Sequence, residues 1–331
     1  MDDLELRSEC IEASDFDCVL CCRTLWKPVT TPCGHTYCSS CLQRSLDYSS
    51  NCPLCMTPLT EYLTSGEKCV TQFLETALLV GLPVDYANRL MLDRAEVSSL
   101  AYSPDLPVFV CTTAFPTVSC PLFVFEPRYR LMIRRAVETG AGRFGMAACV
   151  KLPNGTKSCR YADYGTELEI RDWMLMNDGC SILSNVGMRR FRVTCRGERD
   201  GYDTARVEYF TDEPIPRSSL AEIATLHDQV MSSGRQWFNR MSADLKGEIL
   251  RTFGDMPALE RDWYKLRDGP AWAWWLVAIL PLGPQLQVSI LATTCLEKRL
   301  RAIDKTLRHL EEASSRVQPT GATLLRQHHL T

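Results

Sequence analysis

Seven cysteines and one histidine at metal-ligand spacing lie between positions 18 and 55 of the 331-residue chain. They form three Cys-x-x-Cys pairs and one Cys-x-His pair, so that four short half-sites follow one another. Zinc takes four thiolate or imidazole ligands in a tetrahedron, and two ligands on one tight turn can bind the same ion. The sequence therefore predicts two zinc ions, bound by Cys18, Cys21, Cys33, His35, Cys38, Cys41, Cys52 and Cys55.

The alternative is that these are ordinary buried cysteines, but chance rarely produces so regular a spacing in so short a segment. Cys22 lies beside a ligand, yet Cys21 already gives the expected two-residue spacing, so Cys22 is left out. Each predicted ion is fully bound by protein side chains, which leaves no open position for water or substrate. The zinc is therefore expected to be structural, and the segment to act by binding another molecule.

The order of these ligands, with the single histidine in fourth place, resembles that of the RING finger family. The run Thr-Pro-Cys-Gly-His-Thr-Tyr-Cys at positions 31–38 carries the same resemblance. In that family the two sites interlock as a cross-brace. The resemblance implies that one ion is bound by Cys18, Cys21, Cys38 and Cys41, and the other by Cys33, His35, Cys52 and Cys55.

RING fingers are ubiquitin-protein ligases that bind a ubiquitin-charged conjugating enzyme in a shallow apolar groove and hold its thioester ready for aminolysis. The resemblance therefore implies a transferase that acts by positioning its partners, without a catalytic residue of its own. The apolar positions that match the groove are Leu20, Pro53, Leu54 and Leu46.

Two positions depart from the RING pattern. Ser45 stands where Trp or Leu is common, with Leu46 next to it, and Met56 stands where many active members have Arg or Lys. In those members the cation bonds to both the conjugating enzyme and ubiquitin. The alternative function is therefore a non-catalytic adaptor that uses its zinc-stabilised finger to bind a partner protein.

The remaining chain divides by its hydrophobic pattern. Strand patterns dominate from 104 to 213, interrupted by one helix at Pro127, and helical patterns follow from 214 onwards. The apolar run 271–282 is too short to cross a bilayer and predicts a buried helix. The predicted regions are a tail (1–15), the zinc finger (16–58), a short helical connector (59–103), a β-rich part (104–213), a helical part (214–315) and a C-terminal tail (316–331).

Several runs after the finger resemble the N-terminal domain of Lon peptidases, and more closely the proteins that join this domain to a RING finger. These runs are 106–111, 121–132, 189–193, 253–257 and 269–276. The resemblance implies an α+β multidomain fold, in which a curled β-sheet or pseudo-barrel precedes a C-terminal helical bundle. It also implies recognition of client proteins, including misfolded ones, in protein quality control. No peptidase activity is expected, because no peptidase or ATPase module follows.

The final helical pattern has apolar residues at alternating three- and four-residue steps from Leu296 to Leu310. We interpret it as a stripe that packs on its own domain, and a coiled-coil dimer is the alternative.

Composition argues against nucleic-acid and membrane partners, because the net charge is only -3. We interpret the basic pairs Arg134–Arg135 and Arg189–Arg190 as solvated faces. The start of the chain lacks the pattern of a signal peptide, which favours a reducing compartment, the cytoplasm or the nucleus.

Overall fold

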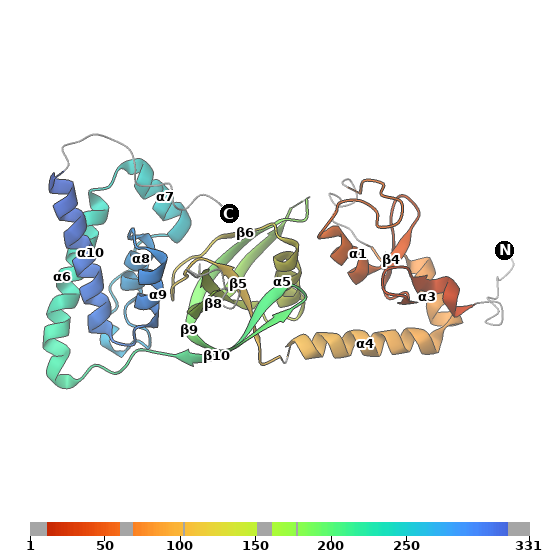
Figure 1. The fold of residues 1–331 in the computed structure, drawn as a ribbon, viewed down its shortest axis with the longest axis horizontal. Coiled ribbons are helices and arrows are strands. Elements are labelled where there is room, and N and C mark those ends of the chain that lie inside the picture. The colour runs from red at the N-terminus through yellow and green to blue at the C-terminus, as the bar shows by residue number, and fades with distance from the viewer. Residues whose placement is uncertain (1–11, 60–68, 102, 151–160, 177, 317–331) are drawn as a thin grey trace.

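A computed structural model describes residues 12–59, 69–101, 103–150, 161–176 and 178–316 of the chain. Three parts follow one another along its long axis: a small N-terminal part, a curled sheet and a helical bundle (Figure 1). The expected α+β class, with a curled sheet followed by helices, is confirmed. Among the described helices, none combines the length and apolar character needed to cross a membrane.

The N-terminal part consists of short elements around a small core. Tyr37, Cys38 and Cys52 are completely buried in this core, and Leu42 and Val29 pack beside them. Its elements are the 3-10 helix η2 (Ala13–Phe16), the strands β1 (Asp17–Cys18), β2 (Arg23–Thr24), β3 (Pro28–Thr30) and β4 (Thr36–Cys38), and the helix α1 (Ser39–Leu46).

Two helices, α3 (Gln72–Gly81) and α4 (Pro83–Ala101), occupy most of the connector. One face of α4 packs against the N-terminal part, where Tyr86 is buried and its ring centroid lies 4.9 Å from that of Trp26. The Tyr86 hydroxyl donates a 2.6 Å hydrogen bond to Glu75 of α3. The connector is therefore packed against the N-terminal part.

Six strands form one curled sheet in the order β10-β5-β7-β8-β9-β6, and β10 also pairs with β9. This extra pairing closes the sheet into a barrel-like form and leaves β6 with a single strand partner in the described sheet. The strands are β5 (Leu106–Cys111), β6 (Leu122–Val124), β7 (Arg143–Cys149), β8 (Tyr161–Leu175), β9 (Ser181–Arg199) and β10 (Tyr202–Phe210).

Glycine makes the tight curvature possible where strands pass over a large ring. A Cβ atom at Gly165 of β8 would collide with the ring of Phe191, and one at Gly145 of β7 would crowd the same ring. The predicted helix at Pro127 is α5 (Pro127–Glu138), which packs against the hydrophobic core of the sheet. Its Tyr129 stacks on Phe109 with ring centroids 4.0 Å apart.

The helical part is built around three tryptophans of α8 (Ala271–Ile279), which are 0–1% exposed. The predicted buried helix is therefore present, as is the self-packing stripe: Leu296, Leu300 and Ile303 of α10 lie in the same core. The other elements are η3 (Arg217–Ser219), α6 (Leu220–Asn239), α7 (Ala243–Phe253), η4 (Trp263–Lys265), α9 (Pro284–Ala292) and α10 (Leu296–Arg316).

A buried ionic cluster joins the sheet to the helices. Arg190 of β9 is completely buried and lies 2.6 Å from Asp212 and 2.7 Å from Asp268. Arg299 of α10, also completely buried, binds the same Asp212. The interpretation of Arg189–Arg190 as a solvated face is therefore wrong for Arg190, whose charge is compensated inside the protein.

The N-terminal part rests on the sheet part through a second set of ion pairs. Arg134 of α5 binds Asp47, which follows α1 and is buried. Asp200, in the β9–β10 turn, binds Arg44 of α1 at 2.7 Å and Arg135 of α5 at 2.6 Å. Arg134 is thus an interdomain contact, and Arg135 holds Asp200, the partner of Arg44, from within the sheet part. With side chains only 19% and 14% exposed, neither arginine lies on a solvated face, which corrects that interpretation.

Candidate zinc centres and docking surface

The eight predicted ligands gather into two clusters of four. In each cluster the ligand atoms all lie within 4.8 Å of one another. One cluster contains Cys18, Cys21, Cys38 and Cys41, and the other contains Cys33, His35, Cys52 and Cys55. The first and third half-sites along the chain form one cluster, and the second and fourth form the other. This is the cross-brace grouping that the resemblance implied.

The same backbone turn places the first and last Cys-x-x-Cys pairs. The N–H of Cys22 donates to the carbonyl of Cys18 at 2.8 Å, and the N–H of Met56 donates to that of Cys52 at 2.9 Å. Cys22 and Met56 have φ angles of 51° and 61°, in the left-handed region. The residue after each pair is therefore turned away from the cluster, and Cys22 lies outside both sets.

Donors surround the sulfur atoms of the first cluster. The backbone N–H of Trp26 lies 3.2 Å from Cys38 Sγ, and the backbone N–H of Cys38 lies 3.5 Å from Cys18 Sγ. The guanidinium of Arg89 is 3.7 Å from Cys38 Sγ. Sequence reasoning missed Arg89 because it lies on α4, 51 positions after the cysteine it approaches. Its role depends on how α4 packs, and the local pattern carries no signal of that.

Electrostatics in the second cluster favour thiolate. Burial alone would raise the pKa of the Cys52 thiol, but hydrogen bonds from Tyr37 and from the backbone N–H groups of Cys55 and Leu54 lower it to about 6. The Tyr37 hydroxyl lies 3.0 Å from Cys52 Sγ and is itself buried.

The two donor sets fit zinc. One set has four sulfurs, and the other has three sulfurs and one imidazole, both of which are usual in closed tetrahedral sites. Zinc bound there would supply crosslinks between loops that are too short to pack alone. With four protein donors for each ion, the sites have no open position for substrate.

The predicted docking residues do not all reach the surface. Leu20 and Leu54 are 40% and 53% exposed, and Pro53 is half-buried. Leu46 is only 6% exposed and belongs to the core of the finger. The prediction that Leu46 contributes to the docking surface is therefore corrected, because its position at the end of α1 turns the side chain inward.

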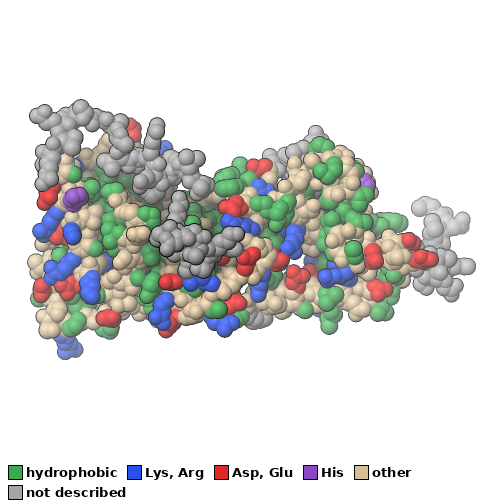
Figure 2. All heavy atoms as spheres, in the orientation of Figure 1, with side chains coloured by type: hydrophobic (Ala, Val, Ile, Leu, Met, Phe, Trp, Pro, Cys, Tyr) green, Lys and Arg blue, Asp and Glu red, His purple; other side chains and the backbone are tan. Residues whose placement is uncertain are grey.

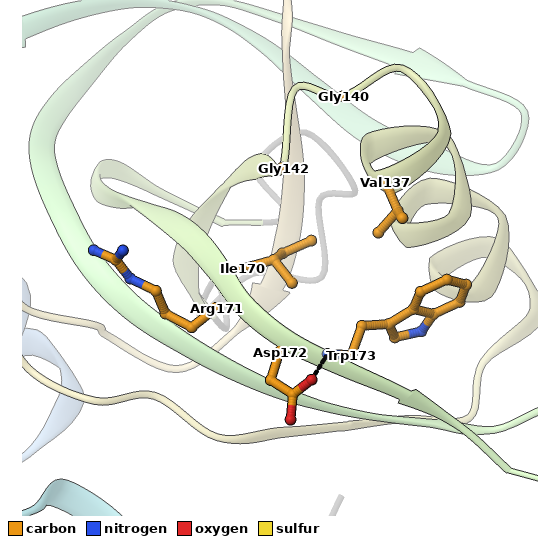
Figure 3. Close-up of a pocket in the computed structure, with 7 residues that line it drawn as sticks. All are labelled: Val137, Gly140, Gly142, Ile170, Arg171, Asp172 and Trp173. Atoms are coloured by element: carbon orange, nitrogen blue, oxygen red, sulfur yellow. Dashed lines mark hydrogen bonds between the residues drawn. The ribbon is translucent and has the colours of Figure 1, made fainter.

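A shallow hollow of about 280 Å³ lies between the end of α5 and β8. Figure 3 shows Ile170 and Val137 on its walls, with Asp172 and Trp173 at one side. The Asp172 carboxylate accepts a 2.9 Å hydrogen bond from the backbone N–H of Trp173. Among the residues that line this hollow there is no pair of a nucleophile and a base. The hollow does not suggest an enzymatic site.

Two family descriptions match the chain. Residues 105–309 match the ATP-dependent protease La (LON) substrate-binding domain, and residues 17–55 match the zinc finger of C3HC4 type, the RING finger. In solved structures, a Lon N-terminal domain protein from Xanthomonas campestris covers 61% of this chain and 97% of its own, with 26% identity and a TM-score of 0.39.

Among curated proteins, a Schizosaccharomyces pombe protein named LON peptidase N-terminal domain and RING finger protein is 28% identical over 222 residues, or 62% of this chain and 44% of the relative. The Saccharomyces cerevisiae postreplication repair E3 ubiquitin-protein ligase RAD18 is 41% identical over 59 residues, or 18% of this chain and 12% of the relative. The chain thus spans less than half the length of either relative.

The matched segments coincide with the parts that the structure separates. The finger with its two clusters lies in residues 17–55, and the curled sheet with its helices lies in residues 105–309. The chain therefore belongs to the Lon substrate-binding domain family, and it joins that domain to a RING finger whose two clusters fit two zinc ions.

Proposed function

We propose that this protein is a RING-type ubiquitin-protein ligase that recruits client proteins through its Lon substrate-binding domain. The observation that carries the proposal is the pair of interlocked clusters with two exposed leucines, Leu20 and Leu54, on their loops. Large exposed apolar side chains on a rigid, metal-bound scaffold provide an anchor for a partner protein. The similarity to a named E3 ligase in this region supports the same function.

In the proposed reaction a client lysine attacks the thioester between ubiquitin and the conjugating enzyme. The amide bond forms as the thioester breaks, and the thiol of the conjugating enzyme leaves. The RING finger supplies no reacting group. It acts by docking the conjugating enzyme through Leu20, Pro53 and Leu54 and by orienting the thioester.

The test is conjugation by the full chain with activating enzyme, ATP, ubiquitin and a panel of conjugating enzymes. We expect conjugates with the parent protein and a loss of at least tenfold with Leu20→Ala, whose zinc content is first verified. The matched control is Leu259→Ala, which removes a 52% exposed leucine from the helical part. Equal activity of Leu20→Ala and Leu259→Ala would reject the docking surface.

A second candidate function, a non-catalytic adaptor, is favoured by Met56. This residue is 61% exposed beside the last ligand, where a cation would be available to a partner. If zinc-loaded protein gives no conjugates with any conjugating enzyme, the adaptor is the better description. Conjugation that appears only with Met56→Arg would assign the defect to this position.

We also propose that the protein works in a reducing compartment, the cytoplasm or the nucleus. In support, every cysteine in the described residues is free of a disulfide. Seven of these cysteines belong to the zinc clusters, and Cys22 follows the ligand Cys21. Imaging of the tagged full chain in cells tests this location, and a secretory distribution would contradict it.

A further inference from the structure

The outer face of the sheet carries a row of exposed apolar side chains at one end. Phe123 of β6 lies directly opposite Ile182 of β9, which lies opposite Met174 of β8. Residues directly opposite each other in neighbouring strands point to the same face of the sheet. The three side chains are 52%, 46% and 60% exposed. Phe125 extends the row, with its ring centroid 6.1 Å from that of Phe123.

The row ends at the open edge of the sheet. Of the six described strands, β6 alone has a single strand partner, since the pairing of β10 with β9 closes the other side. Edge strands offer unpaired backbone groups, and proteins usually guard them with charged side chains. The run 119–125, Ser-Cys-Pro-Leu-Phe-Val-Phe, contains no charged residue. No second strand of the described sheet pairs with this edge, so it can take backbone pairing and apolar contact, except at Pro121, which lacks an N–H, and at the Phe125 carbonyl, which accepts from Arg130.

The edge is also continuous with the contact between the two domains. Arg130 of α5 donates to the carbonyl of Phe125 at 2.8 Å and to that of Asp178 at 3.2 Å. The same guanidinium reaches the carbonyl of Asp47 in the RING finger at 3.4 Å. Figure 2 shows hydrophobic side chains gathered over this end of the sheet, next to the N-terminal part. A polypeptide on β6 would therefore lie beside the RING finger.

We propose that β6 is a strand-addition site for an extended, apolar segment of a client protein. The segment would pair its backbone with the free edge of β6 and place alternate side chains next to Phe123, in line with Ile182 and Met174. This mode gives affinity through main-chain hydrogen bonds and selectivity through alternate apolar side chains. Such segments are buried in folded proteins and exposed in unfolded ones, which defines the class of client.

This inference rests on the proposed function for its biological meaning, but its test does not use ubiquitin. The probe is a fluorescein-labelled peptide, Lys-Val-Thr-Val-Thr-Val-Lys, and its binding to the zinc-loaded full chain is measured by fluorescence anisotropy. Successive backbone N–H groups of a strand point to opposite edges. N-methylation of the valines therefore blocks one edge of the peptide, and N-methylation of the threonines blocks the other.

We expect one methylated peptide to bind as the parent peptide does and the other to bind at least tenfold more weakly. Equal effects of the two methylations would overturn strand addition. Phe123→Ser should weaken binding of the parent peptide at least tenfold. The control Leu259→Ser, at an exposed leucine of the helical part, should leave that affinity unchanged. Unchanged binding to a folded Phe123→Ser protein would overturn the location.

The two proposals can fail separately. Leu20→Ala should reduce conjugation at least tenfold and leave peptide binding intact, because Leu20 lies in the RING finger and the peptide site in the sheet. A protein that forms conjugates but binds neither the parent nor the methylated peptides would overturn the strand-addition site alone. A protein that binds the peptides but forms no conjugates would retain the site and reject the ligase.

Discussion

Arg299 Nη2 lies 2.6 Å from Asp212 Oδ1, and neither side chain is more than 6% exposed. Burial lowers the pKa of Arg299, and the hydrogen bonds and charge of Asp212 act against that shift. Because Asp212 also binds Arg190, one carboxylate compensates two buried cations that come from the sheet and from the last helix.

Asp212→Asn should therefore destabilise the Lon part strongly. Removal of one member of a buried ion pair typically costs about 3–5 kcal/mol, because the remaining charge is left without compensation in a poor solvent. Urea unfolding followed by tryptophan fluorescence measures the change, since Trp274 packs against both arginines.

The matched control is Glu208→Gln, which breaks the pair with Arg192 between side chains that are 60% and 55% exposed. Exposed pairs are worth roughly 0–1 kcal/mol. Equal shifts of the unfolding midpoint for Asp212→Asn and Glu208→Gln would contradict the importance of the buried cluster.

Zinc content should distinguish Cys21 from its neighbour Cys22. The full chain is expected to release two zinc ions on denaturation, measured with a colorimetric chelator. Cys22→Ser should retain both ions, because Cys22 lies outside both clusters, while Cys21→Ser should retain fewer than two. Loss of zinc in Cys22→Ser would mean that the cluster exchanges Cys21 for its neighbour.

Arg89→Ala should weaken zinc retention without removing a ligand. Mutation of a group that hydrogen-bonds to a metal ligand typically lowers metal affinity about 10- to 100-fold. Competition with a chelator of known affinity measures the effect. Arg94→Ala, on the exposed part of the same helix, serves as the control, and equal zinc affinity of the two variants would assign Arg89 a packing role only.

Asp200→Asn should loosen the RING finger from the sheet, because Asp200 binds both Arg44 and Arg135. Deuterium uptake of α1 and α5 should rise, while that of α10 stays unchanged. Asp163→Asn, whose pair with Arg196 does not cross the interface, is the control. Unchanged uptake in both α1 and α5 would argue against this contact in solution.

The same contact should depend on pH. Burial would raise the pKa of Asp200, but its ion pairs with Arg135 and Arg44 lower it below the usual value. A lowered pKa in the folded state stabilises that state above the unfolded pKa of about 4. This contribution should be lost as the pH falls through the lowered pKa, and the deuterium uptake of α1 in acid should then approach that of Asp200→Asn.

Features that depend on the spacing of nearby residues could be predicted from the sequence. The zinc ligands follow from pairs two residues apart, and α10 follows from its apolar steps. The β-rich part 104–213 was predicted, but the bounds of β7 and β8 within it were not, because Gly145 and Gly165 interrupt the apolar alternation. Those glycines are needed because the ring of Phe191 passes over them, and that contact comes from a distant part of the chain.

Burial that depends on the tertiary fold could not be predicted. Leu46 occupies a position that resembles a docking residue, yet α1 directs it into the core. In the sequence, Arg190 resembles half of an exposed basic pair. Its charge is compensated only because the fold brings Asp212 and Asp268 next to it. In both cases the deciding partners lie far along the chain or on another element.

The 19-residue strand β9 pairs with β8 over residues 181–192, with β6 over 181–183 and with β10 over 190–199. A strand that is held by three neighbours cannot be peeled away from one side. Under pulling force it must break several ladders together, so the sheet should behave as a mechanical clamp. If a client segment binds at β6 as we propose, the sheet would stay intact while that segment is drawn away from it.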